Sequence, residues 1–185
     1  MSMNLVPKKL FFTRGVGVHR EKLQSFELAL RDAGIATLNL VSVSSIYPPG
    51  CRIIPRSRGE EMLEAGQIAF VVMSRQESNE PHRMLAASIG VAVPRDRRMF
   101  GYLSEHHTFG QTEKEAGDYA EDLAAAMLAS TLGVEFDEDQ SWDEKRQLWK
   151  ISTKIVTTRN ITQSAVVGRH AKWTTVLASA VLLLG

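Results

Sequence analysis

The sequence predicts an α+β protein in which helices cover β-sheets. The apolar segments follow the order strand, helix, a group of strands, a longer helix and two final strands. This order differs from the regular alternation of strands and helices in parallel α/β folds. The chain has 185 residues, 44% of them hydrophobic, which suffices for one core. We therefore expect a single domain over residues 1–185.

The first elements are predicted to be a strand, a helix and a second strand. Residues 10–18 are typical of a strand, and Gly15 and Gly17 within it permit a bulge or the close approach of another backbone. The helix ends at Gly34. Its buried face is predicted from four residues at helical spacing: Leu23, Phe26, Leu30 and Ala33. Residues 36–43 form the second strand.

The rest of the chain alternates strands with one long helix. A helical turn is expected at 60–63, and strands are expected at 67–74, 84–93 and 99–105. Thr112 and Glu115 have the spacing of a capping box, so the helix begins there and ends near Leu132. Its buried face is predicted to hold Ala116, Tyr119, Leu123, Met127 and Ser130. An acidic loop at 137–144 and strands near 148–157 and 172–184 complete the prediction.

Composition argues against several classes of function. The net charge is +1, from 22 basic and 21 acidic residues, so we expect neither a nucleic-acid partner nor a membrane surface. The apolar run at 173–184 is too short to span a bilayer as a helix. The single cysteine, Cys51, excludes an internal disulfide and is typical of a reducing cytoplasm, where we expect the protein to reside.

Two adjacent serines stand where the second predicted strand must turn. Ser44 and Ser45 follow a β-branched run and precede the rigid corner of Pro48, Pro49 and Gly50. A hydroxyl beside a constrained amide can attack it, so that Ser45 Oγ takes the acyl group of Ser44 as an ester. Elimination and hydrolysis would then leave a pyruvoyl group. The alternative is an ordinary turn with no chemistry.

Three other residues are candidates for a site, each with a structural alternative. Asn39 could stabilise an oxyanion if the chain curls back, or could cap a turn. Glu105 could donate a proton, or could bind a metal with His107 and His82, a weak ligand set that leads us to expect no metal. Glu27, expected on the buried helix face, could pair with Arg31 or with a cationic ligand.

Seven segments together resemble the pyruvoyl-dependent arginine decarboxylases, from about Lys9 through the last strand. They are GVGVH (15–19), SFELALRDAGI (25–35), NLVSVSSIYPPG (39–50), NEPHRMLAASIG (79–90), GYLSEHHTFG (101–110), GDYAEDLAAAML (117–128) and RNITQSAV (159–166). The resemblance implies a four-layer αββα sandwich. It also implies self-cleavage between Ser44 and Ser45 into a β chain of residues 1–44 and an α chain of residues 45–185. The pyruvoyl group formed from Ser45 would then serve to decarboxylate L-arginine to agmatine and CO2.

The resemblance also assigns roles to individual residues. Glu105 corresponds to the proton donor, and Asn39 to a residue implicated in processing. Glu27, Leu30 and Ser44 correspond to substrate-binding positions, with the Glu27 carboxylate meeting the guanidinium. Trimers of αβ units, possibly paired into hexamers, are implied, with each site between neighbouring subunits. Two alternatives stay open: decarboxylation of another cationic amino acid, and a non-enzymatic binding or assembly module whose chain stays uncut.

Overall fold

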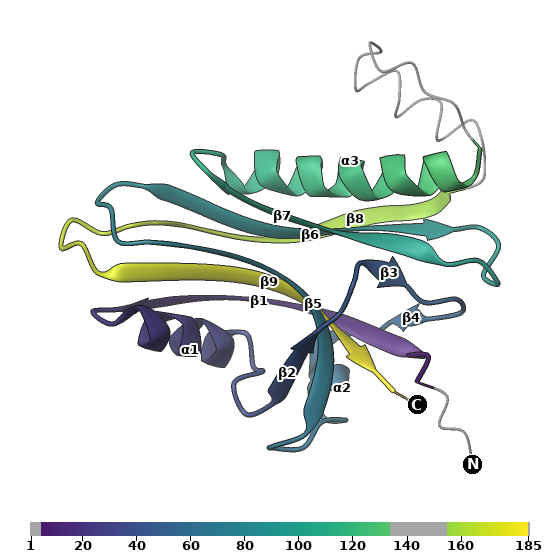
Figure 1. Cartoon of the computed structure of the whole chain (residues 1–185), viewed down its shortest axis with the longest axis horizontal. Helices are drawn as coiled ribbons and strands as arrows, with labels where there is room; N and C mark the ends of the chain where they lie inside the picture. The colour runs from purple at the N-terminus through teal and green to yellow at the C-terminus, as the bar shows by residue number, and fades with distance from the viewer. Residues whose placement is uncertain (1–4, 134–154, 185) are drawn as a thin grey trace, which may run out of the picture.

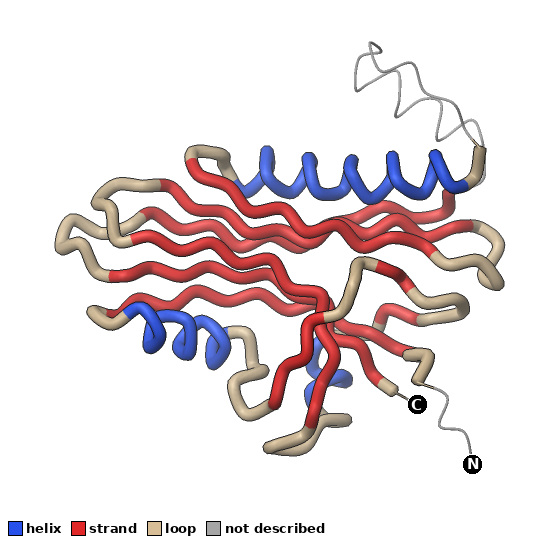
Figure 2. Tube along the Cα trace, viewed as in Figure 1, coloured by secondary structure: helices blue, strands red, loops and turns tan. Residues whose placement is uncertain are grey.

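The computed structural model describes residues 5–133 and 155–184, which form four layers. Helix α1 (Lys22–Asp32) packs on one sheet, helix α3 (Glu113–Thr131) packs on a second, and the two sheets face each other between the helices (Figure 1). Figure 2 shows the same order of layers from the helices and strands alone. The α+β class and the αββα sandwich expected from the resemblance are both confirmed.

The first sheet has five strands in the order β2-β5-β9-β1-β4. At its centre, β9 (Trp173–Leu183) runs antiparallel to both β1 (Lys9–His19) and β5 (Ile68–Ser78). Short strands form the edges: β2 (Asn39–Ser42) pairs in parallel with β5, and β4 (Arg52–Ile53) pairs in parallel with β1. A one-turn helix, α2 (Arg56–Glu60), follows β4.

The second sheet has four strands in the order β3-β7-β6-β8. The long antiparallel strands are β6 (Met84–Pro94), β7 (Gly101–Phe109) and β8 (Ile155–Val166). Strand β3 (Ile46–Tyr47) pairs only with the first two residues of β7, so the remainder of β7 forms the edge of the sheet. The main core lies between the two sheets and includes Leu10, Val72, Ile89 and Leu103, all fully buried.

Both helices place small residues closest to the sheets. In α1, Ser25 and Ala29 are fully buried. Of the expected buried face, Ala33 is buried and Phe26 and Leu30 pack partly buried against the core, but Leu23 is 78% exposed, so the expectation is wrong at Leu23. The cause is on β1: a Cβ at Gly15 would overlap Ala29 O, and one at Gly17 would overlap Ser25 O. The close approach that these glycines permit leaves no room for a large side chain.

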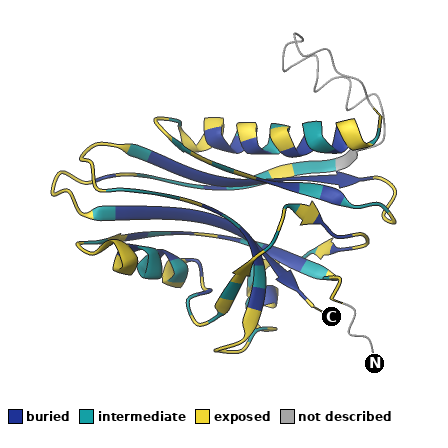
Figure 3. Cartoon of the chain, in the orientation of Figure 1, coloured by how far each residue is buried: buried dark blue, intermediate teal, exposed yellow. Residues whose placement is uncertain are grey.

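Helix α3 repeats this arrangement on the second sheet. Its buried residues are mainly alanines, and Tyr119 and Leu123, expected on the buried face, are exposed (Figure 3). Gly90 on β6 lies directly against the backbone of Ala120, which again requires small residues at the contact. The capping box at Thr112 and Glu115 is confirmed, with both of its hydrogen bonds formed.

Other differences from the sequence prediction concern strand limits. The two-residue strands β3 and β4 were not expected, because such short segments carry too little periodicity to detect. Strand β7 continues four residues beyond Glu105, and β8 runs to Val166 where the prediction ended at 157. The acidic loop at 137–144 and the predicted strand start near 148 lie outside the described residues.

Candidate active site

The bond between Ser44 and Ser45 lies where the chain crosses from one sheet to the other (Figure 1). On the first sheet, the Val43 N–H donates to Val71 O at 3.0 Å and so extends the β2–β5 pairing by one residue. On the second sheet, the Leu103 N–H donates to Ser45 O at 2.9 Å. The peptide bond is thus anchored one residue before Ser44 and again at Ser45.

The carbonyl of Ser44 already accepts a hydrogen bond within a three-residue turn. The Ile46 N–H donates to Ser44 O at 2.9 Å, a separation of two residues that is typical of a γ-turn. If Ser45 Oγ attacked the Ser44 carbonyl, this N–H would face the oxygen on which negative charge develops. This donor could not be identified from the sequence, because residue type does not reveal where a backbone N–H points.

The structure brings Glu105 to the Ser45 hydroxyl. Ser45 Oγ donates to Glu105 Oε2 at 3.5 Å, a long hydrogen bond. Glu105 is two residues after buried Leu103 on β7, and residues two apart on a strand point to the same face of the sheet. Glu105 therefore projects from the face that lines the inter-sheet core. It remains exposed because β3 ends before reaching this part of β7. Glu105 is therefore in mid-strand, not at the strand end expected from the sequence.

Asn39 is held away from the serine pair. Its Nδ2 donates to Gly66 O at 2.7 Å, and the residue opens β2 opposite Ile68. The strand alone separates Asn39 from Ser42 by about 10 Å, at about 3.3 Å per residue. The expectation that the chain curls back toward Ser44 is not met, because these residues stay extended in the sheet.

The substrate-binding candidates on α1 occupy two different environments. Glu27 is 43% exposed, not buried, and its Oε1 accepts from Arg31 Nε at 2.5 Å, which is the structural alternative considered above. Leu30 packs into the core beneath α1 beside Phe11 and Ile35. Within the described part of this one chain, neither residue has a recorded hydrogen bond or ion pair with Ser45 or Glu105.

An apolar cavity of about 390 Å³ adjoins Ser44. Its walls include Val43, Ile46 and Phe70, and the N-terminal residues Leu5 and Val6 close one side. Sequence reasoning missed this contribution from the N-terminal segment, which shows no recognisable pattern. The cavity could accept an aliphatic chain next to the Ser44 carbonyl.

A metal centre finds no support among the residues that the structure describes. No three His, Cys, Asp or Glu residues come together there as a possible metal site. His106 Nε2 instead forms a 2.9 Å hydrogen bond with Gln111 Oε1, and its ring packs against Tyr119. His82 occupies the turn before β6, where its φ is 64°.

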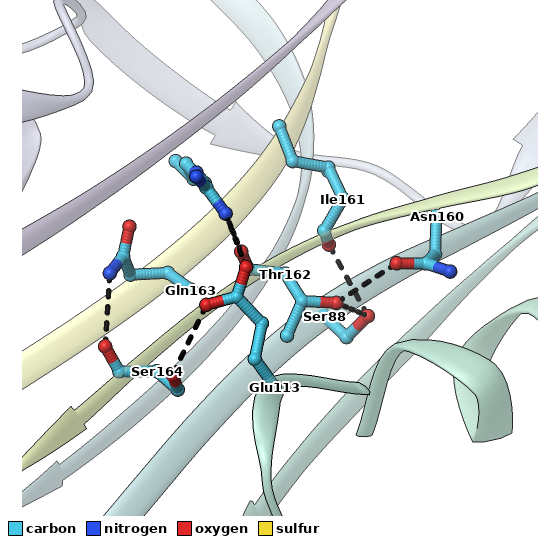
Figure 4. Close-up of polar contacts among 8 residues, drawn as sticks. Ser88, Glu113, Asn160, Ile161, Thr162, Gln163 and Ser164 are labelled. Atoms are coloured by element: carbon cyan, nitrogen blue, oxygen red, sulfur yellow. Dashed lines mark hydrogen bonds and ion pairs between the residues drawn. The ribbon is translucent and has the colours of Figure 1, made fainter. Parts of the chain in front are cut away.

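A second polar cluster, where α3 begins above β8, is fully engaged in internal contacts. Glu113 Oε1 accepts from Arg14 at 2.7 Å, and Glu113 Oε2 accepts from Ser164 Oγ at 3.2 Å. Thr162 and Ser88 hydroxyls lie 2.7 Å apart next to it (Figure 4). Because Arg14 belongs to β1, this cluster joins the two halves of the sandwich, and we assign it a structural role.

Comparison with known proteins identifies the family. The sequence profile described as pyruvoyl-dependent arginine decarboxylase matches residues 9–184. A protein of that name from Nitrosopumilus maritimus is 58% identical over 98% of this chain and 100% of its own length. A probable member from Chloroherpeton thalassium is 57% identical over 98% of this chain and 100% of its own. A second form from Methanosarcina mazei is 51% identical over 97% and 98%.

No helix within residues 5–133 and 155–184 is long and apolar enough to cross a membrane. The four-layer fold, the serine pair between the sheets and these full-length matches agree with one another. The chain belongs to the pyruvoyl-dependent arginine decarboxylase family.

Proposed function

We propose that this protein decarboxylates L-arginine to agmatine and CO2 by means of a pyruvoyl group that it makes from its own Ser45. One observation carries the proposal: in a chain of this family, the Ser44–Ser45 bond is held between two sheets with Glu105 at the Ser45 hydroxyl. The names of the relatives, which cover nearly the whole chain, support arginine as the substrate. Because Cys51 is a free thiol, we place the reaction in the cytoplasm.

Cofactor formation follows from the geometry of the turn. Ser45 Oγ attacks the carbonyl carbon of Ser44, the C–N bond between the two residues breaks, and the hydroxyl proton ends on the Ser45 nitrogen. The Ile46 N–H, already on Ser44 O at 2.9 Å, stabilises the oxyanion. Loss of the Ser45 Cα proton expels Ser44 as a carboxylate and leaves dehydroalanine, which water converts to the pyruvoyl group and ammonia.

The surrounding residues fit a pyruvoyl group at position 45. Bound there, the group supplies an electrophilic carbonyl and an electron sink for the departing carboxylate. Glu105, 3.5 Å from the Ser45 oxygen, holds the proton that replaces CO2 on the substrate carbon. The apolar cavity beside Ser44 accommodates the aliphatic part of the substrate.

Cleavage itself is tested on two serine variants. Ser45→Ala removes the attacking hydroxyl, so denaturing electrophoresis should show only the 20.5 kDa chain, with no decarboxylase activity. Ser44→Ala is the matched control, because the mechanism uses only the carbonyl of Ser44, and it should still be cut. Mass spectrometry of wild type should show a pyruvoyl group at the start of the 45–185 fragment. An active but uncut wild-type chain would disprove the cofactor source.

We further propose that the complete site lies between subunits of a trimer. Glu27 and Asn39 lie apart from Ser45 within one chain, yet Glu27 is half exposed and Asn39 is exposed, so both are available to a neighbour. Co-expression of Glu27→Gln with the inactive Ser45→Ala should then raise activity above that of Glu27→Gln alone, because one subunit's intact Glu27 would serve another's pyruvoyl group. Failure of complementation in mixed assemblies would place the whole site in one chain.

Substrate choice is tested by comparing arginine with lysine, ornithine and histidine. A carboxylate at Glu27 binds a guanidinium in bidentate fashion, which a single ammonium group cannot match. We expect kcat/KM to be highest for arginine and this preference to shrink in Glu27→Gln. Equal kcat/KM for lysine would indicate selection for charge alone.

A further inference from the structure

An open pocket lined by arginines borders the segment that follows Ser45, from Tyr47 to Ile53. Its volume is about 500 Å³, within the range of small-molecule sites. We call it the arginine pocket, and its lining includes Arg52, Arg97, Arg159, Tyr47, Cys51 and Thr157. It shares no lining residue with the apolar cavity beside Ser44.

The three guanidinium groups come from separate parts of the fold. Arg52 belongs to β4, Arg97 to the turn between β6 and β7, and Arg159 to β8. Arg159 is two residues before Ile161, which packs against the inter-sheet core, and residues two apart on a strand share a face. Arg159 therefore projects from the inner face of its sheet. The pocket therefore lies at the edge of the inter-sheet core, where Arg159 places a cation on a face that elsewhere carries core residues.

A buried phenol lines the same pocket as these cations. Tyr47 is 2% exposed, and its hydroxyl donates to Cys51 O at 2.6 Å. Burial raises the pKa of the Tyr47 hydroxyl, and Arg97 and Arg159 both act against that rise through their charge. Both arginines line the same pocket as Tyr47.

Acidic residues near the pocket are already engaged elsewhere. Asp96 is paired with Arg98 at 2.8 Å, and Glu121 accepts from Thr158 and Asn160 on the opposite face of β8. Among the described residues, no carboxylate pairs with Arg52, Arg97 or Arg159. Counting only residues 5–133 and 155–184, three such cations and no acid line this concave site, which concentrates positive potential.

We propose that the arginine pocket binds a small anion bearing carboxylate or phosphate groups. Arg97 and Arg159 would contact the anion directly, with Arg52 at the rim of the pocket. The planar guanidinium fork matches both carboxylate and phosphate oxygens in bidentate fashion. The Thr157 side chain offers a further hydroxyl. The same charges repel arginine's guanidinium and agmatine, which makes this a site distinct from the proposed substrate site.

Thermal unfolding of the purified protein tests the proposal directly. Inorganic phosphate and citrate are the two probes, each compared with sodium chloride at equal ionic strength. At saturation we expect the unfolding midpoint to rise by about 5 °C or more with at least one probe. Phosphate alone would indicate a phosphorylated ligand, and citrate alone a carboxylate ligand.

Variants separate a specific site from general salt effects. Arg97→Gln and Arg159→Gln should abolish the shift while remaining folded and cut at Ser45. Arg95→Gln is the matched control, an exposed arginine in the same turn as Arg97 but outside the pocket lining, and it should keep the shift. No shift in wild type beyond chloride, or equal loss in Arg95→Gln, would overturn the proposal. So would a change of oligomeric state in Arg97→Gln or Arg159→Gln, because the arginines would then serve a subunit contact.

Discussion

Replacing Glu105 with Gln separates proton donation from every other role of that side chain. Gln keeps the shape and an acceptor oxygen for the Ser45 hydroxyl, but it has no acidic proton to give. At 3.5 Å the ground-state hydrogen bond is long, so its loss should cost no more than about 1 kcal/mol. Loss of general acid catalysis costs roughly 10²- to 10⁴-fold in rate, or about 3 to 5 kcal/mol. We therefore expect Glu105→Gln to be cut normally and to have a kcat at least 100-fold lower, in the range of about 10²- to 10⁴-fold.

Agmatine release per pyruvoyl group is the measurement that isolates this effect. Mass spectrometry gives the fraction of chains that carry the group, and the rate is divided by that fraction. Glu113→Gln is the control, because Glu113 is also a half-exposed, hydrogen-bonded carboxylate but lies in the cluster that joins Arg14 to Ser164. Its kcat should stay within about twofold of wild type. A Glu105→Gln enzyme as fast as wild type would refute the proton-donor role, and an uncut one would move Glu105 to processing.

Two further predictions concern stability. Gly17→Ala forces a Cβ against Ser25 O and should lower the free energy of unfolding in urea by about 1 to 3 kcal/mol, whereas Gly168→Ala, with no atom within 4 Å of the added Cβ, should not. Burial raises the pKa of the Cys51 thiol from 9.0 to about 11, so above pH 9 the unfolded chain loses this proton while the folded chain keeps it. Stability should therefore fall between pH 9 and pH 11, by on the order of 2 kcal/mol, and Cys51→Ala should flatten that slope. An equal slope in both proteins would assign the loss to other groups.

Elements were predictable wherever one pattern continued for a turn or more. The long strands and both main helices were identified, and the capping box at Thr112 was located to the residue. The buried faces of the helices were predicted only in part, because hydrophobic spacing weights large side chains such as Leu23 and Tyr119, which are exposed. The contact is decided instead by backbone approach at glycines such as Gly17, which hydrophobicity does not register.

The site was predictable in its residue types and only partly in its geometry. Ser45 and Glu105 are 60 residues apart in sequence and meet because β3 pairs with β7, a strand pair too short to foresee. Glu27 was expected on a buried face and lies half exposed beside Arg31. If the site is shared between subunits, as we propose, then neither one sequence nor one chain's structure can display all of its parts.

The position of the proposed cut would allow the protein to break its own chain and keep its fold. Residues 1–44 contribute β1, α1 and β2, and β1 pairs with β9 along its whole length inside the first sheet. Leu10 and Phe11 on that strand are fully buried, so the fragment cannot leave without opening the core. We expect both fragments to elute together on gel filtration and to separate only in denaturant. Separation under native conditions would show that the intact Ser44–Ser45 bond, and not the sheets on either side of it, holds the sandwich together.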